Sequence, residues 1–147
     1  MSDSNLTQMF PLRVVVMPTR APVQGNDVLY NEAYNTWQKC WKEALFELDG
    51  TSELPCDHFT RQDYAVALFH GQKCAALIFF RRIDPKLEAH RNDSYFEAWP
   101  KDFLATFGEA NQTAMICSWI TTLPEYRRTL NNPALKNLDL SLRLSEV

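Results

Sequence analysis

The chain has 147 residues, 46% of them apolar and 22% charged, which suffices for one globular domain and excludes a disordered chain. Its 15 lysines and arginines against 18 aspartates and glutamates give a formal net charge of −3, which excludes a domain-wide basic field for nucleic acid. Glycine is scarce, with four residues or about 3% against roughly 7% on average, and this excludes a glycine-rich loop that cradles a phosphate.

The first half of the chain is predicted to form a strand and a long helix. Residues 1–10 are polar and are expected to be a flexible N-terminus. Residues 12–17 are a β-branched run stopped by a proline, which is typical of a strand. Apolar residues then recur at spacings of three and four, so we expect an amphipathic helix that begins at Asn26 or Asp27 and ends at Gly50.

A β-hairpin is predicted in the middle of the chain. Residues 51–63 are polar and are predicted to be a loop. The apolar runs 64–69 and 74–80 flank a short glycine-containing turn, which is typical of a hairpin whose two faces are both covered. We expect this hairpin to lie in the middle of a sheet and the long helix to pack on it through Trp37 and Trp41.

The last part of the chain alternates irregular and regular segments. These are a helical or irregular excursion (83–102), a helical turn (103–107), a strand (114–122) and a final helix that starts at Pro133. Tyr95, Phe96 and Trp99 stand in the charged excursion and are a candidate partner surface. The whole order is β-α-β-β-(α)-β-α, which predicts an α+β fold with a mixed, mostly antiparallel sheet and flanking helices.

No segment is suited to crossing a membrane or to export. The longest apolar runs fall far short of the roughly 20 residues that span a bilayer, and residues 1–5 carry no signal-peptide features. The cysteines are Cys40, Cys56, Cys74 and Cys117. They form no CxxC pair, so we expect free buried thiols and a cytoplasmic protein. Cys56 and His58 alone are too few ligands for a metal site.

Three segments together resemble the acetyl-coenzyme A dependent N-acetyltransferase (GNAT-like) superfamily. Residues 119–128 (WITTLPEYRR) are similar to the V-x-P-x-Y-R-R turn between its fourth strand and the helix that receives the cofactor. Residues 57–60 (DHFT) and 82–85 (RIDP) resemble the D-x-F-D loop and R-L-L-P strand end of acyl-homoserine lactone synthases and N-acyl amino acid synthases. The resemblance implies a single acyltransferase-like domain over residues 11–147.

This resemblance implies transfer of an acyl group from an acyl carrier protein or acyl-coenzyme A to an amine. It implies no tightly bound cofactor and no metal. Ser118, the residue shared with the family's E-L-S-R pattern, and Asp57, which would orient the amine, are the implied catalytic residues. The residues expected to bind the donor are Arg127, Arg128, Thr129 and Arg82.

The chain departs from the family at two places. No glycine follows Arg128, so the backbone cradle for the coenzyme A pyrophosphate is missing, and we expect acetyl-coenzyme A to bind weakly or not at all. Ile116, Cys117 and Trp119 replace the other residues of the E-L-S-R pattern, so a carboxylate that could deprotonate an amine is missing there. The departures favour an alternative function, a catalytically silent relative that acts as a binding or dimerisation module.

The candidate residues also have purely structural interpretations. The arginines after the last strand are typical of a solvated turn, Ser118 fits a satisfied hydroxyl in a core strand, and Asp57 fits an ordinary turn. Arg81 and Arg82 are neighbours in a strand, so only one of them can reach any one pocket.

The strand at residues 114–122 is expected to need a neighbour. It is apolar and uncharged, a composition that pairs with another chain when its edge is open. The superfamily continues through further strands, whereas this sequence ends at Val147. We therefore expect a homo-oligomer, a partner chain that completes the sheet, a fragment of a longer protein, or a smaller fold; nucleic acid and a membrane span are not expected.

Overall fold

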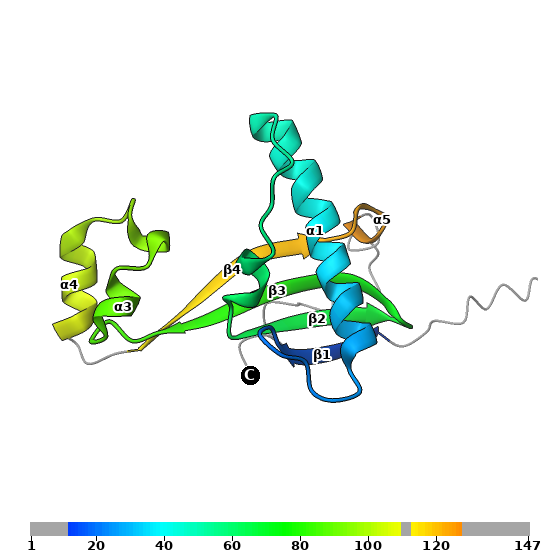
Figure 1. Ribbon diagram of the computed structural model, residues 1–147, viewed down its shortest axis with the longest axis horizontal. Helices are drawn as coiled ribbons and strands as arrows, with labels where there is room; N and C mark the ends of the chain where they lie inside the picture. Colours follow the sequence, from blue (N-terminus) through cyan, green and yellow to red (C-terminus); the bar gives the residue numbers. More distant parts are fainter. Residues whose placement is uncertain (1–11, 110–112, 128–147) are drawn as a thin grey trace, which may run out of the picture.

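A computed structural model describes residues 12–109 and 113–127 and contains one four-stranded sheet (Figure 1). The strands are β1 (Leu12–Pro18), β2 (Tyr64–His70), β3 (Lys73–Ile83) and β4 (Ala114–Thr122), and they lie in the order β1-β2-β3-β4. Each neighbouring pair is antiparallel. The α+β fold with a mostly antiparallel sheet is therefore confirmed, and the described strands contain no parallel pair.

The predicted hairpin forms the middle of this sheet. Strands β2 and β3 are joined by a two-residue turn, and His70 pairs with Lys73 across it. Gly71 stands first in the turn with φ 63°, a left-handed value that this type of hairpin turn requires and that glycine adopts without strain. β3 continues to Ile83, three residues past the predicted end, because it stays paired with β4.

Helix α1 (Asp27–Asp49) crosses one face of the sheet (Figure 1). Both ends agree with the sequence prediction. Gly50 follows the helix with φ 69° and donates its N–H to the carbonyl of Phe46, which satisfies an otherwise free carbonyl group. Trp37 is completely buried and Trp41 partly buried against the sheet, so the predicted packing through these tryptophans is confirmed.

The prediction of a loop over residues 51–63 is wrong in one part. Residues Asp57–Thr60 form a short helix, α2, which turns Phe59 into the core under α1. The ring of Phe59 lies 5.4 Å from that of Trp37 and 4.9 Å from that of Phe79. Burial of this one aromatic residue explains why a polar segment folds back onto the sheet.

The excursion after β3 consists of three short helical segments at the far end of the β3–β4 ribbon, away from α1 (Figure 1). They are α3 (Glu88–Arg91), the 3-10 helix η1 (Ser94–Phe96) and α4 (Lys101–Glu109). Helix α4 is longer than the predicted turn at residues 103–107. This excursion forms a separate small cluster with the ribbon, in which Ile83, Phe96 and Ile116 are buried together.

Helix α5 (Pro124–Arg127) begins two residues after β4 ends, where the sequence analysis expected a turn. A proline is well suited to the first position of a helix, because the N–H that it lacks would have no partner there. The helix predicted from Pro133 lies outside the described residues. None of the helices within residues 12–109 and 113–127 is long and apolar enough to span a bilayer.

Candidate functional site

Strand β4 contains a bulge at its centre. Thr121 is paired with Leu77 and Ser118 with Phe79, which leaves two residues of β4 opposite one residue of β3. One of the two, Trp119, has φ 52°, in the left-handed region. This conformation costs a non-glycine residue about 1–2 kcal/mol, so the surrounding structure has to impose it.

Aromatic packing and a hydroxyl hold the bulge. The ring of Trp119 lies 4.7 Å from that of Trp41, 5.8 Å from that of Trp37 and 5.5 Å from that of His58. The hydroxyl of Thr121 accepts a hydrogen bond from the Trp41 indole at 2.9 Å and donates one to the carbonyl of Trp119 at 2.7 Å. The aromatic rings and the indole donor come from α1 and α2, so the bulge is fixed by tertiary structure.

Three polar residues gather beside the bulge. Ser118 is half-buried on the α1 side of the sheet, and its hydroxyl donates to the Gln62 amide oxygen at 3.5 Å. The amide nitrogen of Gln62 donates in turn to the carbonyl of His58 at 3.0 Å. Ser118 was predicted from the sequence, whereas Gln62 was missed, and His58 was considered only as a metal ligand. No sequence signal marks Gln62, because its proximity depends on the fold of α2.

Asp57 and Arg82 are not brought into contact with Ser118. Asp57 is exposed at the first position of α2, and its carboxylate has no hydrogen bond or ion pair among the described residues. Arg82 is exposed on the opposite face of the sheet, because it is three residues from Phe79, the partner of Ser118, and side chains alternate along a strand. Its backbone N–H donates to the Asp63 carboxylate at 2.5 Å.

The arginines predicted to bind the donor fall at the end of the described chain. Arg127 is the last residue of α5, and its side-chain Nε donates to the carbonyl of Thr122 at 2.9 Å. Its side chain is therefore folded back onto the end of β4. Arg128 and Thr129 lie outside the described residues.

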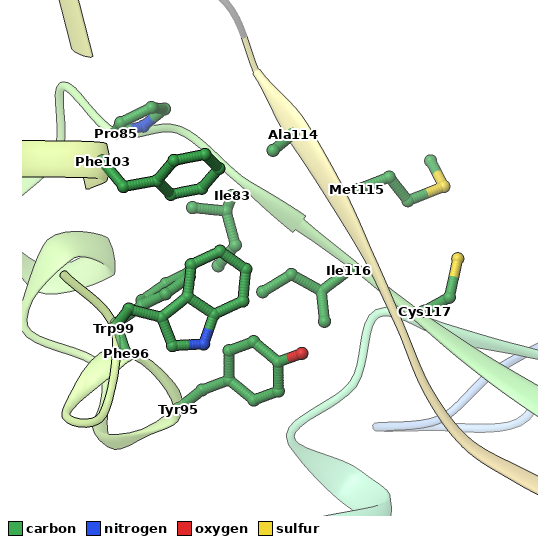
Figure 2. Close-up of a pocket in the computed structure, with 10 residues that line it drawn as sticks. All are labelled: Ile83, Pro85, Tyr95, Phe96, Trp99, Phe103, Ala114, Met115, Ile116 and Cys117. Carbon is green, nitrogen blue, oxygen red and sulfur yellow. The ribbon is translucent and has the colours of Figure 1, made fainter. Parts of the chain in front are cut away.

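An apolar pocket lies along β4 on the other side of Ser118 from the bulge (Figure 2). It has a volume of about 260 Å³, close to the lower end of the roughly 300–1,000 Å³ of small-molecule sites. Figure 2 shows Ile116 pointing toward the aromatic rings, while Met115 and Cys117 point away from them at the edge of the strand. The lining residues are Ile83, Pro85, Tyr95, Phe96, Trp99, Phe103, Ala114, Met115, Ile116 and Cys117.

Four aromatic side chains form one wall of this pocket. The centroids of successive rings are 5.3 Å apart for Tyr95 and Phe96, 5.4 Å for Phe96 and Trp99, and 5.3 Å for Trp99 and Phe103. Phe96 is buried, whereas Tyr95 and Trp99 are 40% and 37% exposed. The residues predicted to form an exposed partner surface thus line a concave site.

An ion pair fixes the aromatic wall to the sheet. The guanidinium of Arg81 on β3 donates to both carboxylate oxygens of Asp93, at 2.8 and 3.2 Å, and lies 5.7 Å from the centroid of the Tyr95 ring. Burial alone would raise the pKa of Asp93, but the N–H of Tyr95 and the charge of Arg81 together outweigh it and hold that pKa below its usual range. Arg81 is thus the member of the arginine pair that serves the pocket.

The opposite rim is held by helix α3. The N–H of Asp84 donates to His90 Nδ1 at 2.9 Å, and Arg91 donates to the carbonyl of Pro85 at 2.8 Å. Pro85 therefore keeps a fixed place in the lining of the pocket.

The burial of the cysteines agrees only in part with the prediction. Cys40 and Cys74 are buried, but Cys56 and Cys117 are exposed, so the expectation of four buried thiols is wrong. Burial raises the pKa of Cys74 to about 12, which makes its thiol unreactive near neutral pH. Across residues 12–109 and 113–127, no three histidine, cysteine or acidic side chains gather in a way that could hold a metal ion.

Comparison with protein-family models, curated proteins and solved structures finds no match to this chain. Its function is therefore inferred from the residues and their geometry.

Proposed function

We propose that this chain is an acyltransferase-like domain that accepts an acyl group from an acyl carrier protein or acyl-coenzyme A and passes it to an amine. The observation that carries the proposal is the apolar pocket, which runs along β4 from Cys117 to Ala114 and begins next to Ser118. An apolar pocket with hydrogen-bonding groups at one end suits a hydrocarbon chain with a thioester head. The same strand bears the sequence resemblance to acyltransferases.

Acyl transfer needs a base and a group that polarises the carbonyl. The amine nitrogen attacks the thioester carbonyl, a C–N bond forms, the C–S bond breaks, the thiol leaves, and the nitrogen loses a proton. His58 is our candidate for accepting that proton, because its ring lies beside Trp119 and its backbone is tied to Ser118 through Gln62. The hydroxyl of Ser118 would donate to the carbonyl oxygen, and Asp57 would orient the amine.

Thiol release measures this reaction. Octanoyl-coenzyme A or an octanoyl carrier protein, mixed with the protein and each of the common amino acids, should release free thiol above the uncatalysed rate. His58→Gln should lower that rate by about 10²-fold or more, as removal of a general base does. His70→Gln is the matched control, because His70 lies at the end of β2 beside Tyr126. A folded protein that releases no thiol with any amine would contradict the proposal.

A second candidate function is a catalytically silent relative that acts as a binding or dimerisation module. It is favoured by Ile116, which stands where the family pattern has its glutamate and whose side chain is buried in the pocket. No carboxylate contacts Ser118 among the described residues. Binding of an acyl thioester without any thiol release would support this alternative.

The edge of β4 is the proposed contact with another chain. In the described sheet β4 is an outer strand, and Met115 and Ile120 on it are 51% and 67% exposed. We propose that a second copy or a partner chain pairs along this edge. Ile120→Lys should then lower the mass measured by light scattering, whereas Val16→Lys on the opposite edge strand should not. A wild-type monomer at tens of micromolar would argue against the partner.

We also propose that the protein works in the cytoplasm. Cys56 and Cys117 are exposed and unpaired thiols, which persist in a reducing compartment. Both should be found reduced when the protein is trapped with an alkylating agent in intact cells.

A further inference from the structure

We infer that the pocket along β4 selects an unsubstituted hydrocarbon chain and rejects a chain that carries a polar group at its far end. This inference rests on the proposed acyl-binding function and names the class of acyl group. It is carried by the way that polar atoms are distributed along the pocket.

The lining of the pocket carries no charged side chain. Its side-chain nitrogen and oxygen atoms are the Trp99 indole nitrogen and the Tyr95 hydroxyl, and Figure 2 shows that hydroxyl turned toward the β4 side at Ile116. The end formed by Pro85, Phe103 and Ala114 offers only carbon from its side chains. A polar group brought to that end would find no side-chain partner.

The distribution of polar atoms also indicates the direction in which the bound acyl chain lies. Ser118 and Gln62 supply hydrogen-bonding groups next to Cys117 at one end of the pocket. A thioester head belongs at this end, so the tail runs toward Ala114. The three residue steps from Cys117 to Ala114 correspond to about 10 Å of strand, at roughly 3.4 Å per residue. The pocket is therefore suited to a chain of medium length.

These properties of the lining predict how strongly the binding affinity differs between acyl chains. Each methylene added within the pocket should strengthen binding about fourfold, since burial of one is worth about 0.8 kcal/mol. A terminal hydroxyl buried without a partner should weaken binding about 5- to 150-fold, because proteins lose about 1–3 kcal/mol for such a group. The gain should stop once the tail reaches Ala114.

Ala114 is the residue that limits the length of the bound acyl chain. It begins β4, opposite Ile83, and its methyl group is the smallest side chain of the lining. Ala114→Phe should fill the tail end and remove the advantage of a longer chain. Ala98→Phe is the matched control, because Ala98 is exposed and is not part of the lining.

The test uses the purified full chain and N-acetylcysteamine thioesters of hexanoate, octanoate, decanoate and ω-hydroxydecanoate. Calorimetry should show binding that strengthens from hexanoyl to decanoyl, with ω-hydroxydecanoyl at least 5-fold weaker than decanoyl. Fluorescence gives a second readout, in which decanoyl should change the emission of Trp99, a lining residue, and Trp99→Phe should lose that change. In Ala114→Phe the advantage of decanoyl should disappear, while Ala98→Phe should keep it.

The outcomes separate this inference from the proposed function. Equal binding of decanoyl and ω-hydroxydecanoyl thioesters, with the change in Trp99 emission, would overturn the inference and leave the acyl-binding function intact. A complete lack of binding and of the change in Trp99 emission would overturn both. If Ala114→Phe fails to fold, the wild-type ligand series decides the question alone.

Discussion

The guanidinium of Arg81 and the carboxylate of Asp93 form an ion pair with two contacts, at 2.8 and 3.2 Å, and this pair joins the sheet to the helical excursion. The Arg81 side chain is only 10% exposed and that of Asp93 is 25% exposed. Asp93 also accepts the N–H of Tyr95, so the ion pair orients the first ring of the pocket wall. The shape of the pocket therefore depends on the Arg81 guanidinium, a charged group that is almost completely buried against the sheet.

Removal of the carboxylate should destabilise the protein. Asp93→Asn leaves the Arg81 guanidinium buried without its counter-charge, so we expect the free energy of unfolding to fall by about 2–3 kcal/mol, less than the ~3–5 kcal/mol of a fully buried pair. Urea denaturation followed by fluorescence measures this change. Glu88→Gln removes the exposed partner of Arg91 and should change the value by less than about 0.5 kcal/mol. Equal effects of the two variants would contradict the assigned role.

The same pair should make stability depend on acidic pH. The pKa of Asp93 is lowered in the folded protein, so its contribution to stability is full above the unfolded pKa of about 3.9 and is lost as pH falls through the folded pKa. The stability difference between wild type and Asp93→Asn should thus be constant above about pH 5 and shrink toward pH 2. A difference that stays constant down to pH 2 would show that the charge of Asp93 contributes little.

The bulge should depend on one hydroxyl. Thr121→Val keeps the shape of the side chain but removes both the acceptor for the Trp41 indole and the donor to the carbonyl of Trp119. We expect a loss of about 1–3 kcal/mol in the free energy of unfolding, as for other buried polar groups left without partners. Thr122→Val is the matched control, since the Thr122 hydroxyl makes no hydrogen bond within residues 12–109 and 113–127. A smaller loss in Thr121→Val than in the control would exclude this role.

Thiol reactivity should divide the cysteines into two classes. In the folded protein a neutral thiol reagent should modify Cys56 and Cys117 within minutes, Cys117 more slowly because burial raises its pKa. Cys40 and Cys74 should react only after unfolding in urea. Peptide mapping by mass spectrometry checks this order, and early modification of Cys74 would contradict its burial.

The packing of Trp37 should dominate the core. Its side chain is completely buried among the rings of Phe59, Phe79 and Trp119. Trp37→Ala should cost about 3–5 kcal/mol of unfolding free energy, and Trp99→Ala, at a residue 37% exposed, should cost clearly less. Thermal unfolding of both variants measures the difference, and an equal loss would mean that the pocket wall is as important to stability as the core.

Local sequence features determined most of the secondary structure of this protein. The helix from Asp27 to Asp49 follows from apolar residues spaced three and four apart and from Gly50, which adopts the left-handed conformation that ends it. The hairpin follows from two apolar runs around Gly71. These signals lie within a few residues of one another, so they can be read without knowledge of the tertiary structure.

Only the tertiary structure decided the geometry of the candidate site. Trp119 adopts a strained conformation because aromatic rings of α1 and α2, far away in the sequence, surround its ring. Its carbonyl accepts a hydrogen bond from Thr121 of the same strand, whose hydroxyl is in turn bound by the Trp41 indole of α1. Which of Arg81 and Arg82 supports the pocket wall depends on the register between β3 and β4. The sequence pattern of a strand shows that successive side chains point to opposite faces of the sheet. It does not show which face packs against a given helix, because that depends on burial against residues distant in the chain.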